Sequence, residues 1–124
     1  MEAIRISGTD DSPEVILDKN ENTFKFSGKS LPEDVKEFYD PIHKWIEEYS
    51  QNPNDETVVE FDMEYFNSAS SKQILDILEQ FATIAQNNKK ITVKWHYISD
   101  DEDMEDAGES YADIVNVPFE LVSH

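Results

Sequence analysis

Residues 57–97 read TVVEFDMEYFNSASSKQILDILEQFATIAQNNKKITVKWHY and decide the fold of this chain. At each end of this stretch, residues 57–63 and 91–97 alternate polar and apolar side chains, as half-buried strands do. Between them, residues 69–87 carry apolar side chains at helical spacing, namely Ile74, Ile77, Leu78, Phe81, Ile84 and Ala85. The order strand, helix, strand predicts two parallel strands joined by a right-handed crossover.

The N-terminal part predicts more strands and a first helix. Residues 14–27 contain two β-rich pieces around a polar break, which favours a hairpin, and residues 4–6 form another short β-rich piece. Ser30 with Glu33 has the spacing of a capping box, so we expect a helix to begin there. Pro41 lies inside that helix and should kink or split it.

The C-terminal part combines many acids with a helical pattern. Residues 100–113 hold eight acidic side chains and no basic one. Apolar side chains keep helical spacing in this region and predict a short acidic helix with one buried edge, made by Met104, Ala107, Tyr111, Ile114 and Val115. A final short strand follows at residues 119–122. We therefore expect one α/β domain over residues 1–124, a small sandwich of three helices on a mixed, mostly parallel sheet of about five strands.

The composition excludes several function classes. The chain has 124 residues, 28 acidic and 10 basic, and a formal net charge of −18. Such a charge disfavours binding to nucleic acid or to anionic membranes. There is no cysteine, which rules out disulfides and thiolate chemistry. No apolar run approaches the roughly 20 residues of a membrane span, and no signal peptide is visible. We expect a cytoplasmic protein whose partners are proteins.

The sequence predicts no metal, cofactor or catalytic site. Neither Asp101 nor Asp103 starts a run with the spacing of an EF-hand loop, so the acidic run is expected to be a solvated helix face. The glycines do not cluster into a phosphate-binding loop. A small hydrolase that uses Asp62, Glu64 and His96 is the alternative from a different class, although no motif places a nucleophile beside them.

The segment Tyr65–Lys72, YFNSASSK, is the candidate functional site. It joins the strand at residues 57–63 to the following helix, and the carboxyl ends of parallel strands are where α/β sheets place their sites. We expect Ser68 to be the N-cap of the helix, and Tyr65 and Phe66 to be exposed in the connection. A helix N-terminus also favours a phosphate, because free N–H groups and the helix dipole stabilise an anion.

Several segments of the chain resemble the SiaC family of bacterial regulatory phosphoproteins, whose fold is similar to STAS domains and anti-sigma factor antagonists. The resemblance covers nearly the whole chain. The matching segments are SGKSLPE at 27–33, FYDP at 38–41 with the Trp-Ile pair at 45–46, EYFNSASSK at 64–72 with ILDIL at 74–78, WHY at 95–97 and DEDMEDAGE at 101–109.

The resemblance implies a non-enzymatic protein that is switched by phosphorylation. A serine/threonine kinase would modify one hydroxyl at the start of the second helix, and a PP2C-type phosphatase would remove the phosphate. The unphosphorylated form would bind a downstream target such as a diguanylate cyclase. The family acceptor is typically a Thr after Asn, and Ser68 takes that place after Asn67, with Ser70 and Ser71 as alternates.

Physical reasoning agrees with such a switch. A phosphate adds about −1.5 to −2 charges, which would oppose docking of a partner that contacts Tyr65, Phe66, Asn67 and Lys72. An anti-sigma factor antagonist in a partner-switching pathway is the alternative within the same class.

Overall fold

The computed structural model describes residues 1–124 as one six-stranded sheet with three α-helices. The strands are β1 (Ile4–Ile6), β2 (Glu14–Asp18), β3 (Thr23–Ser30), β4 (Glu56–Phe66), β5 (Lys90–Tyr97) and β6 (Phe119–Ser123). The helices are α1 (Val35–Tyr49), α2 (Ser68–Ile84), the short 3-10 helix η1 (Ala85–Asn87) and α3 (Glu102–Ile114). The sheet has six strands rather than about five, because β1 pairs with β2 as an additional edge strand.

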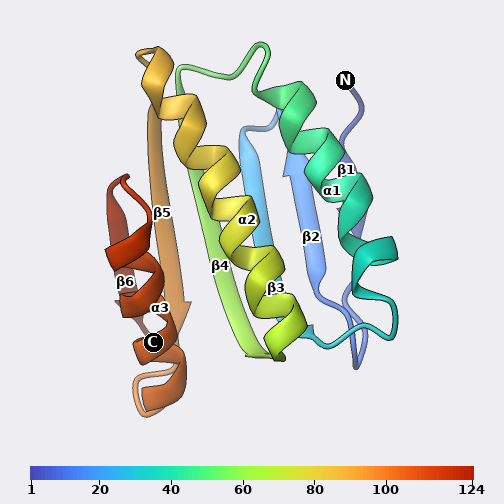
Figure 1. The fold of residues 1–124 in the computed structure, drawn as a ribbon, viewed down its shortest axis with the longest axis vertical. Helices are drawn as coiled ribbons and strands as arrows, with labels where there is room; N and C mark the ends of the chain where they lie inside the picture. Colours follow the sequence, from blue (N-terminus) through green and yellow to red (C-terminus); the bar gives the residue numbers. More distant parts are fainter.

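The sheet is mixed, and its strands lie in sequence order from β1 to β6. β1, β2 and β3 pair antiparallel, which confirms the predicted hairpin, whereas β3, β4, β5 and β6 pair parallel. Each α-helix connects two neighbouring parallel strands, and right-handed crossovers place such helices on the same side. Figure 1 shows all three α-helices on one face of the sheet. The other face carries no helix.

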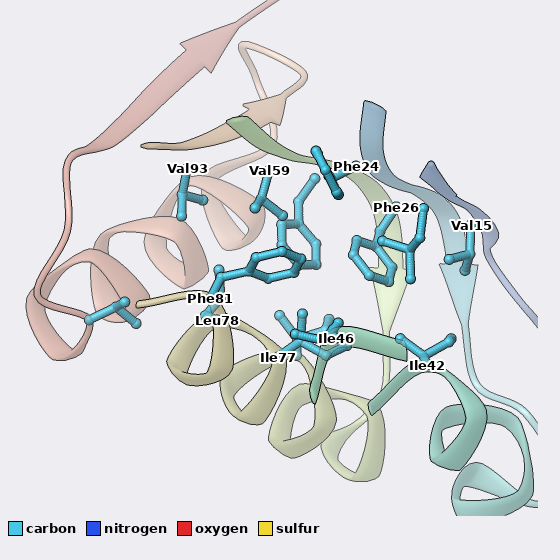
Figure 2. Close-up of a cluster of buried hydrophobic side chains, with 14 of the residues drawn as sticks. Val15, Phe24, Phe26, Ile42, Ile46, Val59, Ile77, Leu78, Phe81 and Val93 are labelled. Atoms are coloured by element: carbon cyan, nitrogen blue, oxygen red, sulfur yellow. The ribbon is translucent and has the colours of Figure 1, made fainter. Parts of the chain in front are cut away.

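The hydrophobic core lies between this sheet and the helices. Alternate residues of the strands point toward α1 and α2, whose apolar stripes cover them (Figure 2). Phe81 of α2 is fully buried, and its ring centroid lies 6.0 Å from that of Phe24 on β3. Phe61 and Val93 are also fully buried in this cluster. The predicted packing of the α2 stripe on the two central strands is therefore confirmed.

Helix α1 begins later than the capping box predicted. Asp34 is its N-cap and accepts a hydrogen bond from the backbone N–H of Glu37 at 3.0 Å. Ser30 is instead the last residue of β3, and its buried hydroxyl is hydrogen-bonded to Tyr39. Pro41 lies inside α1 without splitting it. Because Pro41 is exposed, water can reach the backbone carbonyl that its missing N–H leaves free.

Helices α2 and α3 also differ in detail from the prediction. The helical region at 69–87 consists of α2 and the 3-10 turn η1. Of the expected buried edge of α3, Met104, Tyr111 and Val115 are buried and Ala107 is partly buried, and Gly108 is buried beside them. Ile114 was expected in that edge, but its side chain is 57% exposed. Ile114 is the last residue of α3, and the following residue, Val115, is the one buried in the core.

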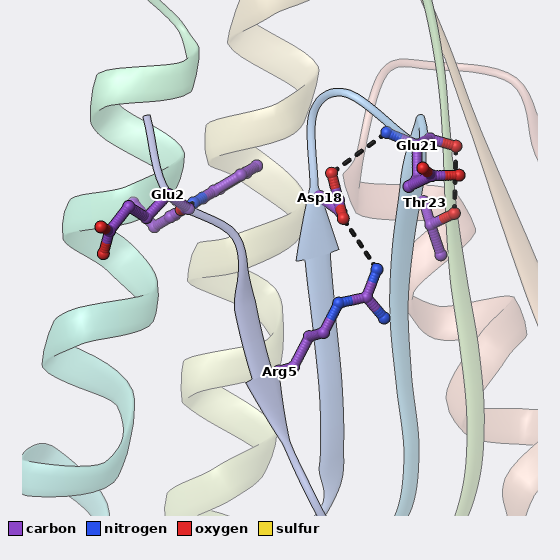
Figure 3. A network of polar contacts seen from close by, with 6 residues as sticks. Glu2, Arg5, Asp18, Glu21 and Thr23 are labelled. Atoms are coloured by element: carbon purple, nitrogen blue, oxygen red, sulfur yellow. Dashed lines mark hydrogen bonds and ion pairs between the residues drawn. The ribbon is translucent and has the colours of Figure 1, made fainter.

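The edge of the sheet that β1 and β2 form is held by polar contacts, as Figure 3 shows. Asp18 at the end of β2 accepts a hydrogen bond from the backbone N–H of Glu21 at 3.0 Å and from the Arg5 guanidinium at 2.7 Å. These two donors, the Glu21 N–H first, lower the pKa of the Asp18 carboxyl. The contacts close the β2–β3 turn and attach the short strand β1 to it.

None of the helices combines the length and the apolar character that crossing a membrane requires.

Candidate functional site

Strand β4 runs three residues past its expected end at Met63 and carries Tyr65 and Phe66. The pairing with β3 shifts between Gly28, which lies opposite Met63, and Lys29, which lies opposite Tyr65, so Glu64 is an extra residue in β4. Such a bulge reverses the face to which the following side chains point. The prediction that Tyr65 and Phe66 lie in a connecting loop is therefore wrong.

The bulge separates the two aromatic side chains. Tyr65 is 51% exposed, as expected. Phe66 is only half-exposed, and its ring packs against Trp95 and Tyr111 with centroid distances of 6.1 and 6.4 Å. Tyr65 is therefore open to solvent, whereas much of Phe66 belongs to the packing between β4, β5 and α3.

Helix α2 begins at Ser68, and Asn67 is its N-cap. The Asn67 side-chain oxygen accepts a hydrogen bond from the backbone N–H of Ser70 at 2.9 Å. The prediction that Ser68 is the N-cap is wrong by one position, because the Asn67 side chain is the one that caps a free N–H group of the first turn. Ser68 is consequently the first helical residue, and its side chain is exposed.

The two other serines of this first turn are engaged inside the protein. Ser70 is fully buried, and its hydroxyl accepts a hydrogen bond from the Ser30 hydroxyl at 2.8 Å. The Ser71 hydroxyl is 2.8 Å from the Tyr111 hydroxyl, which also donates to the Ser71 carbonyl at 2.9 Å. Of the three candidate acceptors, Ser68 is the one with an exposed side chain.

The tyrosines of these contacts keep their protons. Burial raises the pKa of the Tyr39 phenol, which lies beside Ser30, and burial also raises the pKa of the Tyr111 phenol. Both hydroxyls therefore act as neutral hydrogen-bonding groups at ordinary pH. They tie the first turn of α2 to α1 and to α3. Sequence reasoning missed both, because their partners are many residues away in the chain.

Ser68 borders a shallow groove between α2 and α3, which we call the α2–α3 groove. Its volume is about 480 Å³, and it is lined mainly by Ser68, Lys72 and Leu75 of α2 and by Ser110, Tyr111 and Ile114 of α3. The first turn of α2 contains no acidic side chain, whereas that of α3 contains three. Lys72, one turn after Ser68, is exposed on the same side.

The residues of the alternative hydrolase are engaged with other partners. His96 is paired with Glu60, with its Nε2 atom 3.1 Å from a carboxylate oxygen. Asp62 is paired with His124 at 3.2 Å, and Glu64 is the exposed bulge residue. These pairs lie on the sheet face that no helix covers. No group of three or more His, Asp or Glu side chains has a geometry that could hold a metal ion.

Comparison with known proteins identifies the family. A family model described as the SiaC family regulatory phosphoprotein matches residues 6–124. This chain belongs to the SiaC family. The resemblance of the sequence segments is thereby confirmed over almost the whole chain.

The similar proteins are distant in sequence, and the solved structures among them are close in fold. An uncharacterised protein of Pseudomonas aeruginosa (strain UCBPP-PA14) is 23% identical over all of this chain and 98% of its own length. The crystal structure of apo-SiaC from Pseudomonas aeruginosa matches with a TM-score of 0.89 at 23% identity, over 98% of this chain and 99% of that one. SiaC bound to the diguanylate cyclase SiaD, whose activator it is, matches with a TM-score of 0.91 at 23% identity, over 98% of this chain and 99% of that one. These likenesses confirm the fold.

Proposed function

We propose that this SiaC-family protein is a non-catalytic signalling regulator that is switched by reversible phosphorylation of Ser68. The observation that carries the proposal is the difference among the three serines of the first turn of α2. Ser68 is exposed, whereas Ser70 is fully buried and Ser71 is bonded to Tyr111. A kinase must bring the hydroxyl into its own active site, so an exposed side chain is the acceptor that this geometry supports.

The downstream partner we propose is a diguanylate cyclase, bound by the unphosphorylated form. The support is the SiaC relative of the same fold that is an activator of the cyclase SiaD. On this chain, the exposed Tyr65 and Lys72 and the partly buried Asn67 surround Ser68 at the end of β4 and the start of α2. Aromatic side chains often anchor interfaces, so Tyr65 is the proposed anchor, and the partly exposed Phe66 lines the neighbouring α2–α3 groove.

The phosphate would act on the interface rather than on the fold. It adds about −1.5 to −2 charges and three acceptor oxygens. At an exposed first helical position, the free N–H groups and the dipole of α2 favour that charge by about 0.3–1 kcal/mol. The same phosphate would have to be desolvated when a partner covers Ser68. Modification is therefore expected to weaken partner binding while the domain stays folded.

The remaining components of the switch are proposed from the resemblance to the family. We propose a cognate serine/threonine kinase and a PP2C-type phosphatase as the enzymes that act on Ser68, all in the cytoplasm. No cofactor or metal is needed for a protein that works by binding. The pairing of His96 with Glu60 and of Asp62 with His124 supports this non-catalytic role over a hydrolase that uses His96 and Asp62.

The first experiment maps the phosphate by mass spectrometry after incubation with the cognate kinase. We expect modification of Ser68 in the wild type, none in Ser68→Ala, and unchanged modification in Ser110→Ala, which removes an exposed serine across the α2–α3 groove. Phosphate on Ser70 or Ser71 with Ser68 unmodified would contradict the assignment.

The second experiment measures binding to the cyclase. Ser68→Ala should bind like the wild type, and Ser68→Asp should bind more weakly with a near-native melting curve. Gln86→Glu adds one negative charge at the far end of the same helical region and should bind normally. Equal binding of Ser68→Asp and wild type, together with equal binding after enzymatic phosphorylation, would contradict the switch.

A further inference from the structure

Lys72 is the one basic residue on the two helices that form the α2–α3 groove. α2 contains no other Lys or Arg, and α3 contains none at all. The same two helices carry many acids, namely Asp76, Glu79, Glu102, Asp103, Glu105, Asp106, Glu109 and Asp113. Lys72 is therefore the single cation that these two helices offer to an anion near Ser68.

The Lys72 ammonium is not used inside the protein. Its side chain is exposed, and the ion pairs of the structure join Arg5 to Asp18, Lys89 to Asp55 and two histidines to carboxylates. Lys72 therefore takes no part in holding the fold. A cation that is free in the folded protein remains available to a phosphate or to a partner.

Lys72 stands four residues after Ser68 in the same helix, and both line one groove. Residues four apart on a helix have Cβ atoms about 5–6 Å apart, within the reach of a lysine side chain. An anion that precedes the lysine by four residues is also the more favourable orientation for such a pair. A phosphate on Ser68 would thus meet the Lys72 ammonium without any change of the backbone.

We propose that Lys72 couples the phosphorylation state of Ser68 to partner binding by changing its ion-pair partner. In the unphosphorylated protein its ammonium pairs with a carboxylate of the docked partner; after modification it pairs with the phosphate of its own helix. The partner then loses its cation and meets a negative charge in the same place. This inference rests on the function proposed above, and it adds a partner surface with an acidic group facing Lys72.

The first test follows the phosphate itself and needs no partner. Phosphoserine is installed at position 68 by genetic encoding, and its second ionisation is titrated by 31P NMR. The second pKa of phosphoserine is ordinarily about 6, and a nearby cation lowers it. Lys72→Gln should raise that pKa by about 0.3 unit, the scale of an exposed ion pair, while Lys72→Arg stays near the wild type.

The matched control is Lys44→Gln, which removes an exposed lysine of α1 with the same change of net charge. It should leave the phosphate titration unchanged. Titrations that agree within 0.1 unit for wild type, Lys72→Gln and Lys44→Gln would overturn the pairing. This test is independent of which residue the kinase selects, so its failure differs from failure of the Ser68 assignment by mass spectrometry.

The second test measures binding to the cyclase in a double-mutant cycle. We expect Lys72→Gln to weaken binding of the unphosphorylated protein by about fivefold, which corresponds to about 1 kcal/mol. Phosphoserine at 68 should then weaken binding by a smaller factor in Lys72→Gln than in the wild type. If phosphoserine weakens binding by the same factor in the wild type and in Lys72→Gln, the proposed coupling through Lys72 is overturned, even where phosphorylation itself still controls binding.

Discussion

Asn67 and Ser68 show how a shift of one position changes the chemistry of a residue. A serine at the N-cap directs its hydroxyl to backbone N–H groups of its own helix. Here Asn67 has that role and bonds the N–H of Ser70. Ser68 therefore stands in the first turn with its side chain exposed. The asparagine thus leaves the serine hydroxyl exposed, as the proposed role of Ser68 as phosphoacceptor requires.

Gly108 allows α3 to lie close to the sheet. A Cβ atom at this position would be 2.5 Å from a methyl carbon of Leu121 and 2.5 Å from Cδ1 of Trp95. The Trp95 indole N–H also donates to the Met104 carbonyl of α3 at 3.0 Å. These contacts hold in place the helix that forms one wall of the α2–α3 groove.

We predict that Gly108→Ala lowers the free energy of unfolding by about 1–3 kcal/mol, because the added methyl group overpacks the contact with Trp95. An exposed glycine in a helix would behave in the opposite way, since alanine has the better helix propensity by about 1 kcal/mol. Urea denaturation measures the change, with Ser110→Ala as the control on the exposed side of α3. A stabilised Gly108→Ala would show that α3 is not packed this tightly.

At the scale of elements, β4 and α2 together present the site. β4 is 11 residues long and lies between the parallel strands β3 and β5, so its position is set on both sides. Its bulge at Glu64 directs Tyr65 to solvent and Phe66 toward Trp95. α2 follows one residue later and is anchored by its buried stripe. Rigid elements thus position Tyr65 and Ser68.

We predict that Phe81→Ala in α2 lowers the free energy of unfolding by about 3–5 kcal/mol, as expected for removing a fully buried aromatic ring. The ring contacts those of Phe24 and Tyr49, so its loss leaves a cavity between the sheet, α1 and α2. Asp76→Ala, on the exposed side of the same helix, is the control and should change stability little. A loss below about 1 kcal/mol for Phe81→Ala would contradict the assigned packing.

At the scale of the whole molecule, the dominant feature is the net charge of −18. Few of the 28 acidic side chains are neutralised, since only two of the four ion pairs contain Lys or Arg. Like charges repel one another more strongly in the compact state than in the unfolded chain. Repulsion between surface charges therefore destabilises the folded state of residues 1–124.

We predict that the melting temperature rises by about 3–8 °C between 10 and 300 mM NaCl, because salt screens this repulsion. The control is a triple variant of α3, Asp106→Asn, Glu109→Gln and Asp113→Asn, whose charges are exposed. It should melt higher than the wild type at low salt and respond less to added salt. A melting temperature of the wild type that does not change with salt would contradict the prediction.

The sequence alone determined the elements and their order. The alternation in 57–63 and 91–97 and the stripe in 69–87 predicted β4, β5 and α2, and the family motifs identified the SiaC family. These signals are local, because strand and helix periods are set by neighbours within a few residues. The same local signals predict a β-rich piece at residues 4–6, but its pairing with β2 at the edge of the sheet depends on the tertiary structure.

Only the tertiary structure decided which serine is free and which aromatic ring is exposed. Ser70 is buried and hydrogen-bonded to Ser30, 40 residues away in the chain. Ser71 is hydrogen-bonded to Tyr111 at the same separation. The exposure of Tyr65 depends on a bulge that exists only in the pairing of β4 with β3. Such contacts form only when the register of the sheet and the docking of α1 and α3 are set, so no local pattern in the sequence contains them.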